Sequence, residues 1–148
     1  MHVFGWPFET TLTLARLVFS GIMEEFGNLK IFTHHLGGMI PFYWGRMEES
    51  YLPEYVKKTD VALRKPLKEY FGMFYYDTAV GNNPGAIKCA YEIFGVDQIV
   101  FASDAPYGPG TGDERLESYP KIIEQLGLPA ADTAKILGGN AAKIFGIK

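Results

Sequence analysis

The sequence predicts an α/β fold built on a small parallel sheet. Three short apolar, β-branched runs alternate with longer stretches in which apolar residues recur at helical spacing. Such alternation is typical of right-handed βαβ units, which place their strands parallel in one sheet. The 148 residues show no repeat or linker, so residues 1–148 are expected to form a single domain. That domain is either a modest doubly wound layer or part of an α/β barrel, which takes about 250 residues when complete.

The first half of the chain should contain a helix, a strand and an interrupted helical region. Apolar residues at three- and four-residue steps predict a helix over residues 9–26, with Pro7 before it and Gly27 after it. The run LKIFTHHL at 29–36 predicts the first strand, which ends at a Gly-Gly pair. Helical residues follow over 40–70 and are interrupted by prolines.

The second half should supply two further strands and four helices. The runs FGMFYYDTAV at 71–80 and QIVFAS at 98–103 predict strands, with a compact helix over 84–94 between them. A loop rich in glycine and proline then leads to helices near 115–126, 130–137 and 140–145. Asn140 is in the position of an N-cap for the last of these helices.

Composition excludes several classes of protein. With 47% apolar and 21% charged residues, the chain is neither disordered nor fibrous, and its only cysteine, Cys89, rules out an internal disulfide framework. A formal charge of −3 without a concentrated basic face argues against nucleic-acid binding. No apolar run reaches the roughly 20 residues that span a bilayer, and no signal peptide is evident, so we expect a cytoplasmic protein without membrane contact.

Polar side chains follow each of the three predicted strands. His34 and His35 end the first, Asp77 the second and Asp104 the third. In parallel α/β sheets these ends meet where loops and helix N-termini converge. Imidazole and carboxylate groups together are typical of a divalent-metal or general-base site. The alternative is structural, with the aspartates capping helices and a histidine packed beneath a loop.

Four strings in the sequence resemble, in order, the C-terminal half of metal-dependent hydrolases of the amidohydrolase superfamily. The similar group includes aminocarboxymuconate-semialdehyde decarboxylase and γ-resorcylate decarboxylase. The strings are NLKIFTHHLGGMIPFYWGR, FYYDTAV, DQIVFASDAPYG and KILGGNAAKIFGI, and the lead-in GWPFETT extends the resemblance over nearly the whole chain. The resemblance implies a (β/α)8 TIM barrel, of which this chain would hold about strands six to eight with their flanking helices.

The resemblance also implies roles for particular residues. His35 matches a histidine that activates metal-bound water or protonates the substrate, and Asp104 matches an aspartate that ligates the metal and acts as a general base. Arg46 matches an arginine that holds an acidic substrate across a subunit contact. Trp6 is a further candidate for the wall of the substrate pocket, on its aromatic character alone. The implied cofactor is a divalent metal, with zinc favoured over manganese.

Other family ligands do not occur in this sequence. The H-x-H or E-x-H pair of the first barrel strand and the histidine of the fifth are absent, so the chain alone should bind metal weakly or not at all and be inactive. The function indicated is a metal-dependent hydrolase or decarboxylase acting on a small carboxylate-bearing substrate, present here as the C-terminal half. The alternative is a noncatalytic half-barrel remnant that serves as an assembly or binding module.

A half-barrel would leave strand edges and interior side chains without neighbours. We expect a homo-oligomer, or capture by a complementing N-terminal half, to cover them. The side chains expected to be left open are Ile31, Phe74, Tyr76, Val100 and Ala102, and the residues expected at a second contact are Trp44, Tyr51 and Tyr55.

Overall fold

A three-stranded parallel sheet forms the centre of the protein. The structure is a computed structural model that describes residues 2–50, 63–108 and 112–147. Strand order follows the chain, with Phe32 opposite Tyr75 and Asp77 opposite Val100. The α/β class and the parallel sheet predicted from the sequence are thereby confirmed. The strands are β1 (Ile31–Thr33), β2 (Phe74–Asp77) and β3 (Ile99–Val100).

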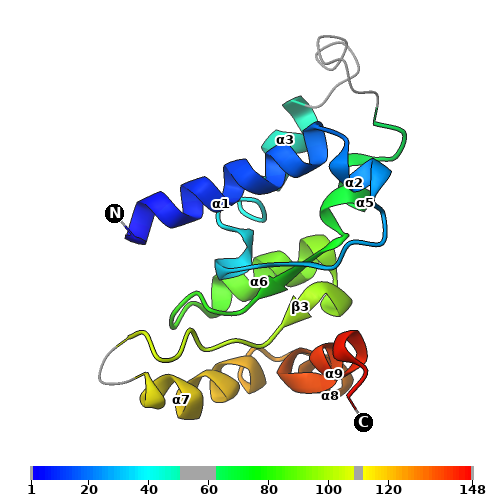
Figure 1. Ribbon diagram of the computed structural model, residues 1–148. Coiled ribbons are helices and arrows are strands. Elements are labelled where there is room, and N and C mark those ends of the chain that lie inside the picture. Colours follow the sequence, from blue (N-terminus) through cyan, green and yellow to red (C-terminus); the bar gives the residue numbers. More distant parts are fainter. Residues whose placement is uncertain (1, 51–62, 109–111, 148) are drawn as a thin grey trace.

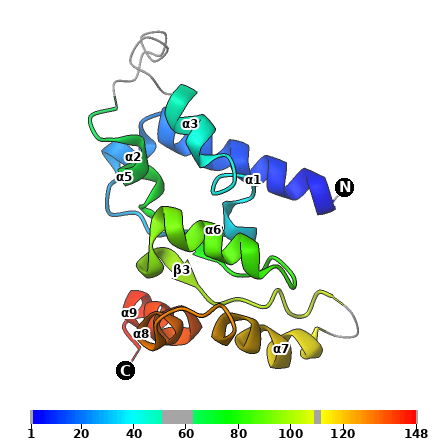
Figure 2. The same ribbon diagram turned by 180° about the vertical axis from the view of Figure 1, so that it is seen from behind.

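Helices flank the sheet on both sides and cover one of its faces. In Figure 1, α1 runs along the β1 side, and α7, α8 and α9 lie beyond β3. Figure 2, turned by 180°, shows α6 in front of the strands, so α6 covers the rear face of the first view. No helix of the described ranges is long and apolar enough to cross a membrane. The helices are α1 (His2–Phe19), α2 (Ile22–Glu25), α3 (Trp44–Ser50), α5 (Leu67–Phe71), α6 (Pro84–Phe94), α7 (Asp113–Glu124), α8 (Ala130–Ala134) and α9 (Asn140–Phe145), with short turns η1 (His35–Gly37), η2 (Val96–Gln98) and the π-helical η3 (Lys135–Gly139).

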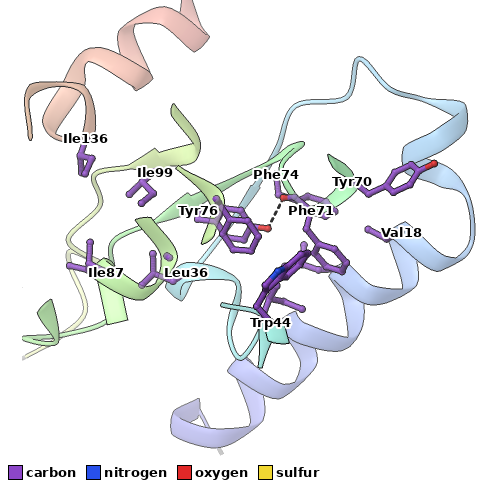
Figure 3. Packing of buried hydrophobic residues seen from close by; sticks show 14 of the residues in the cluster. Val18, Leu36, Trp44, Tyr70, Phe71, Phe74, Tyr76, Ile87, Ile99 and Ile136 are labelled. Carbon is purple, nitrogen blue, oxygen red and sulfur yellow. Dashed lines mark hydrogen bonds between the residues drawn. The ribbon is translucent and has the colours of Figure 1, made fainter. Parts of the chain in front are cut away.

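An aromatic cluster joins the sheet to the helices. The Tyr76 ring stacks on Phe94 of α6 at a centroid distance of 4.4 Å, and the Trp44 ring meets Phe71 and Phe94 edge-on. The Tyr76 hydroxyl donates a hydrogen bond of 2.7 Å to the Phe71 carbonyl, which satisfies the one polar group of this buried ring (Figure 3). Trp44 is therefore part of the core, and its predicted place at an intermolecular contact is wrong. Tyr51 and Tyr55 lie outside the described residues.

The prediction of which strand residues are left open was wrong for Phe74, Tyr76 and Val100, which are all buried. Side chains alternate along a strand, so the stacking of Tyr76 on α6 directs Tyr75 to the opposite face. On that face Phe32 stacks on Tyr75 at 5.1 Å and on Phe145 at 5.4 Å. The apolar surface left open is aromatic, and Phe32 and Phe145 are 42% and 64% exposed.

Element boundaries differ from the predicted ones in a consistent way. The first helix begins at His2 and includes Pro7, because a proline near a helix start forfeits one hydrogen bond in a solvent-exposed turn. It ends at Phe19, since Gly21 adopts a left-handed φ of 82° before α2. All three strands are shorter than the runs that predicted them.

Asn140 anchors the last helix instead of capping it. Its buried amide nitrogen donates 2.7 Å hydrogen bonds to the carbonyl oxygens of Val96 and Ile99. The residue before it is already helical, because η3 continues into α9. Asn140 therefore fixes the C-terminal helices to the entry of β3.

Candidate active site

The turn after β1 is left-handed and presents His35. Four consecutive residues, from His35 to Gly38, have positive φ values of 51°, 54°, 73° and 69°. This conformation costs L-residues about 1–2 kcal/mol each, and glycine adopts it freely. A Cβ atom on Gly37 would lie 2.7 Å from Cε1 of Tyr76, so the second half of the turn must be glycine to pass over β2. The HHLGG string therefore forms a strained turn that fixes the orientation of His35.

Two hydrogen bonds from neighbouring segments hold His35. Its backbone N–H donates to Oδ1 of Asp77 at 2.7 Å, and its ring Nδ1 lies 2.5 Å from the carbonyl oxygen of Ala79. A carbonyl oxygen can only accept, so Nδ1 carries the hydrogen in this contact. In the neutral ring, Nε2 then has a free lone pair that can accept a proton or a hydrogen bond.

Asp104 lies four residues after the end of β3 and is paired with Arg115. Its φ is 65°, so Asp104, like His35 and Leu36, is a non-glycine residue in the left-handed region. Nη1 of Arg115, in the first turn of α7, donates to Oδ2 of Asp104 at 3.0 Å. The guanidinium also lies 5.8 Å from the Tyr119 ring centroid, and a Cβ atom on Gly108 would overlap it. The ion pair is therefore held by packing as well as by charge.

His35 and Asp104 open into the same pocket, which has a volume of about 720 Å3. Trp6 of α1, the aromatic residue suggested by the sequence, lines it too. The structure thus brings together three of the four proposed site residues from α1, η1 and the segment after β3. The described lining residues are His2, Val3, Trp6, Pro7, His35, Gly38, Ala79, Val80, Asn83, Ala86, Asp104, Tyr107, Gly108 and Arg115.

Arg46 and His34 lie away from this pocket. Arg46 is exposed on α3 and is not among the described residues that line the pocket. The His34 ring turns to α1, where Nε2 lies 2.7 Å from Oγ1 of Thr10, and burial lowers its pKa below the ordinary 6.5. His34 therefore belongs with the helix packing, as expected, and the structure does not bring Arg46 to this pocket.

Asp77 holds the backbone of the site in place through hydrogen bonds to two loops. Its Oδ1 accepts from the backbone N–H groups of His35 and Ala79, at 2.7 and 3.0 Å. Burial raises the pKa of this carboxyl above its ordinary 3.8, although both hydrogen bonds and the nearby histidines oppose the shift. These contacts agree with the prediction that Asp77 orders the loop after its strand.

Replacing Asp77 by Asn should make stability less dependent on pH. Because the folded state raises the pKa of Asp77, its contribution to stability is complete below about pH 3.8 and is lost as pH rises through the folded pKa. Asn keeps an accepting oxygen without ionising. Urea unfolding of both proteins at pH 4 and pH 7 should show the variant gaining stability relative to wild type at pH 7. If the two proteins differ in unfolding free energy by the same amount at pH 4 and pH 7, the raised pKa of Asp77 is contradicted.

The described residues do not fit a complete divalent-metal site. Asp104 offers a carboxylate and His35 a free Nε2, and His2 also lines the pocket. Yet within residues 2–50, 63–108 and 112–147 no three His, Cys, Asp or Glu side chains are close enough to share an ion. A catalytic metal site needs at least three protein ligands. The chain supplies a part of such a site.

Arg115 is the site residue that sequence reasoning missed. It follows Asp113 and Glu114 in the first turn of α7. The helix dipole disfavours cations at that end, where acidic residues are stabilising. A lone arginine in an otherwise acidic first turn is therefore a signal that it has a specific anionic partner.

Comparison with known proteins identifies the family. The sequence profile described as "Amidohydrolase" matches residues 1–147. The chain belongs to the amidohydrolase family. The resemblance drawn from the four strings is thereby confirmed, and the enzymatic character of the family favours a catalytic origin over a binding module.

Similar amidohydrolases are decarboxylases of more than twice this length. The 2-amino-3-carboxymuconate-6-semialdehyde decarboxylase of Dictyostelium discoideum is 30% identical, over 97% of this chain and 38% of the relative. The structure of 5-carboxyvanillate decarboxylase from Sphingomonas paucimobilis is 28% identical with a TM-score of 0.84, over 99% of this chain and 42% of the other. A second 5-carboxyvanillate decarboxylase, from Novosphingobium aromaticivorans, is 24% identical with a TM-score of 0.81, over 99% of this chain and 41% of the other. That structure holds manganese and 4-hydroxy-3-methoxy-5-nitrobenzoic acid. The three-stranded sheet therefore corresponds to part of an amidohydrolase barrel.

Proposed function

We propose that this chain is the C-terminal part, about strands six to eight, of an amidohydrolase barrel that decarboxylates a small aromatic carboxylate. The observation that carries the proposal is the convergence of His35 and Asp104, both in strained left-handed conformations, on one pocket. Relatives that decarboxylate carboxylated aromatic rings favour decarboxylation over hydrolysis. Because the chain spans about two fifths of these relatives, the whole activity belongs to the assembled barrel.

In this proposal His35 moves the proton. Decarboxylation replaces a carboxylate on the ring by hydrogen, so a group beside the reacting carbon must deliver a proton to it. Because Nδ1 donates its hydrogen to the Ala79 carbonyl, the lone pair on Nε2 of His35 can take up a proton, and the ring can then deliver that proton to the ring carbon as carbon dioxide leaves. The Asp77 bond to the His35 backbone fixes the turn, so the ring is oriented before substrate arrives.

Asp104 is the residue proposed to ligate the divalent ion. Its carboxylate is the ligand type that manganese and zinc accept, and the manganese in the Novosphingobium relative favours manganese over the zinc expected from the sequence. The other ligands must come from outside the described residues. Trp6 supplies an aromatic wall for the ring, and Arg46 is proposed to reach the substrate carboxylate from a neighbouring copy.

We also propose that the open aromatic face is covered in the working protein. The stacked rings of Phe32, Tyr75 and Phe145 lie on the sheet face opposite α6, where a complete barrel has its interior. Burying such surface contributes about 25 cal/mol per Å2. A complementing N-terminal half or a second copy of the chain would cover it, and no nucleic acid or membrane is needed.

A chimera tests this proposal. The N-terminal part of the Sphingomonas 5-carboxyvanillate decarboxylase, fused to this chain in place of its own C-terminal part, should fold as one barrel and release carbon dioxide from aromatic carboxylates in the presence of manganese. The unfused chain should release none. A chimera that folds and binds manganese, yet decarboxylates no aromatic carboxylate offered, would overturn the proposed function.

A further inference from the structure

A second pocket adjoins the candidate active site and differs from it in chemistry. It has a volume of about 460 Å3 and shares five lining residues with the first pocket, namely His35, Gly38, Val80, Asn83 and Ala86. Its other walls include Leu36, Pro41, Phe42 and Cys89. His35 therefore stands at the junction of the two spaces.

The charged groups are divided unequally between the pockets. Asp104 and Arg115 line the first pocket, and none of the described residues lining the second is an acid, a lysine or an arginine. The Phe42 side chain is 79% exposed although it forms a wall, so its ring offers apolar surface that this part of the chain does not cover. A molecule reacting at His35 would thus meet charge on one side and hydrocarbon on the other.

We propose that the second pocket is an apolar subsite for a hydrophobic substituent on the aromatic ring of the carboxylate substrate. This inference rests on the proposed function, because it takes the charged end of that substrate to lie in the first pocket. The substrate is then a ring with a carboxylate at one end and an alkyl or similarly apolar group at the other. Continuity through His35 and Val80 lets one molecule occupy both pockets.

The chain carries a separate reporter for each pocket. Cys89 is its only cysteine and lines the second pocket, so the rate at which iodoacetamide alkylates the protein reports access to that space. Burial and Glu92 raise the pKa of the thiol, so the reaction is followed at pH 8.5. Trp6 lines the first pocket, and its indole N–H resonance reports binding there, with buried Trp44 as the internal reference.

The probes are benzoate, benzamide and a series of 4-alkylbenzoates from methyl to butyl. Benzoate should shift the Trp6 resonance without slowing alkylation of Cys89, and 4-butylbenzoate should do both. The concentration that halves the alkylation rate should fall roughly fourfold for each added methylene, the transfer preference of one buried CH2 group. Benzamide, which lacks the charge, should shift the Trp6 resonance only at much higher concentration.

Two matched variants locate the effect. Phe42→Ala removes one wall of the second pocket and should reduce the fourfold step per methylene to roughly twofold. Phe4→Ala removes the same ring from α1, where it is 85% exposed and lines neither pocket, and should leave the series unchanged.

The outcomes distinguish failure of the apolar subsite from failure of carboxylate recognition in the first pocket. If 4-butylbenzoate shifts Trp6 but does not protect Cys89, or protects Cys89 equally in Phe42→Ala, the apolar subsite is wrong and the carboxylate pocket stands. If benzoate and benzamide act alike on Trp6, or neither acts, carboxylate recognition by this chain fails, and the subsite proposal fails with it.

Discussion

Asp104→Asn and His35→Gln, each placed in the chimeric barrel, should lower kcat/KM for decarboxylation by about 10²–10⁴-fold. The His35→Gln substitution removes the Nε2 atom proposed to deliver the proton, and the Gln amide cannot act as an acid or base in its place. The Asp104→Asn substitution removes the negative charge that pairs with Arg115 at 3.0 Å and that the proposed ion requires. Steady-state kinetics with an aromatic carboxylate substrate measures both effects.

Two residues outside the pocket lining provide controls of the same type. His34→Gln changes the adjacent histidine, which bonds to Thr10 of α1, and should change kcat/KM by less than about tenfold. Asp97→Asn removes an exposed carboxylate that is paired with Lys135 and does not line the pocket, and it should leave kcat/KM unchanged. Activity retained in both site variants, or lost equally in the controls, would contradict the assignment of the site.

Gly38→Ala should destabilise the protein by about 2–5 kcal/mol, a large part of the stability of a domain this size. Gly38 has a φ of 69°, and a Cβ atom there would overlap the carbonyl oxygen of Pro7 and lie 2.7 Å from Oγ1 of Thr11. Thr11 accepts a hydrogen bond from the Met39 N–H and donates one to Pro7, so the substitution pushes α1 off the His35 turn.

Gly45→Ala is the matched control for this substitution. Gly45 lies in α3, and a Cβ atom there would meet nothing within 4 Å. Alanine should therefore stabilise the helix by about 0.5–1 kcal/mol. Urea unfolding should give a much lower midpoint for Gly38→Ala than for Gly45→Ala. Similar midpoints for the two variants would show that the turn tolerates a side chain at Gly38 and that its contact with α1 is weak.

The order of strands and helices could be predicted from the sequence because it depends on periodicity. Short apolar and β-branched runs placed all three strands, and the family strings singled out His35 and Asp104 after the first and the third of them. Asp77 was also expected to order a loop, and it bonds to two backbone N–H groups.

The open face could not be predicted, because alternation fixes only which side chains share a face. Which face meets the helices depends on packing between distant segments, here Tyr76 on Phe94. The left-handed turn at His35 also breaks the alternation of β1, so residue parity no longer indicates where that side chain points. Arg115 escaped notice for a similar reason, since its partner Asp104 lies eleven positions earlier in the chain and sequence periodicity does not indicate that the two side chains meet.

We infer that this chain carries only part of a metal site, and its ability to retain metal is the direct test. Purified chain is incubated with manganese, passed through gel filtration and analysed for metal by mass spectrometry, alongside the chimeric barrel. We expect the chain to elute essentially free of manganese, because the described residues offer no set of three ligands, and the chimera to retain about one ion. One manganese ion retained per unfused chain would contradict this inference, since the site would then be complete without the rest of the barrel.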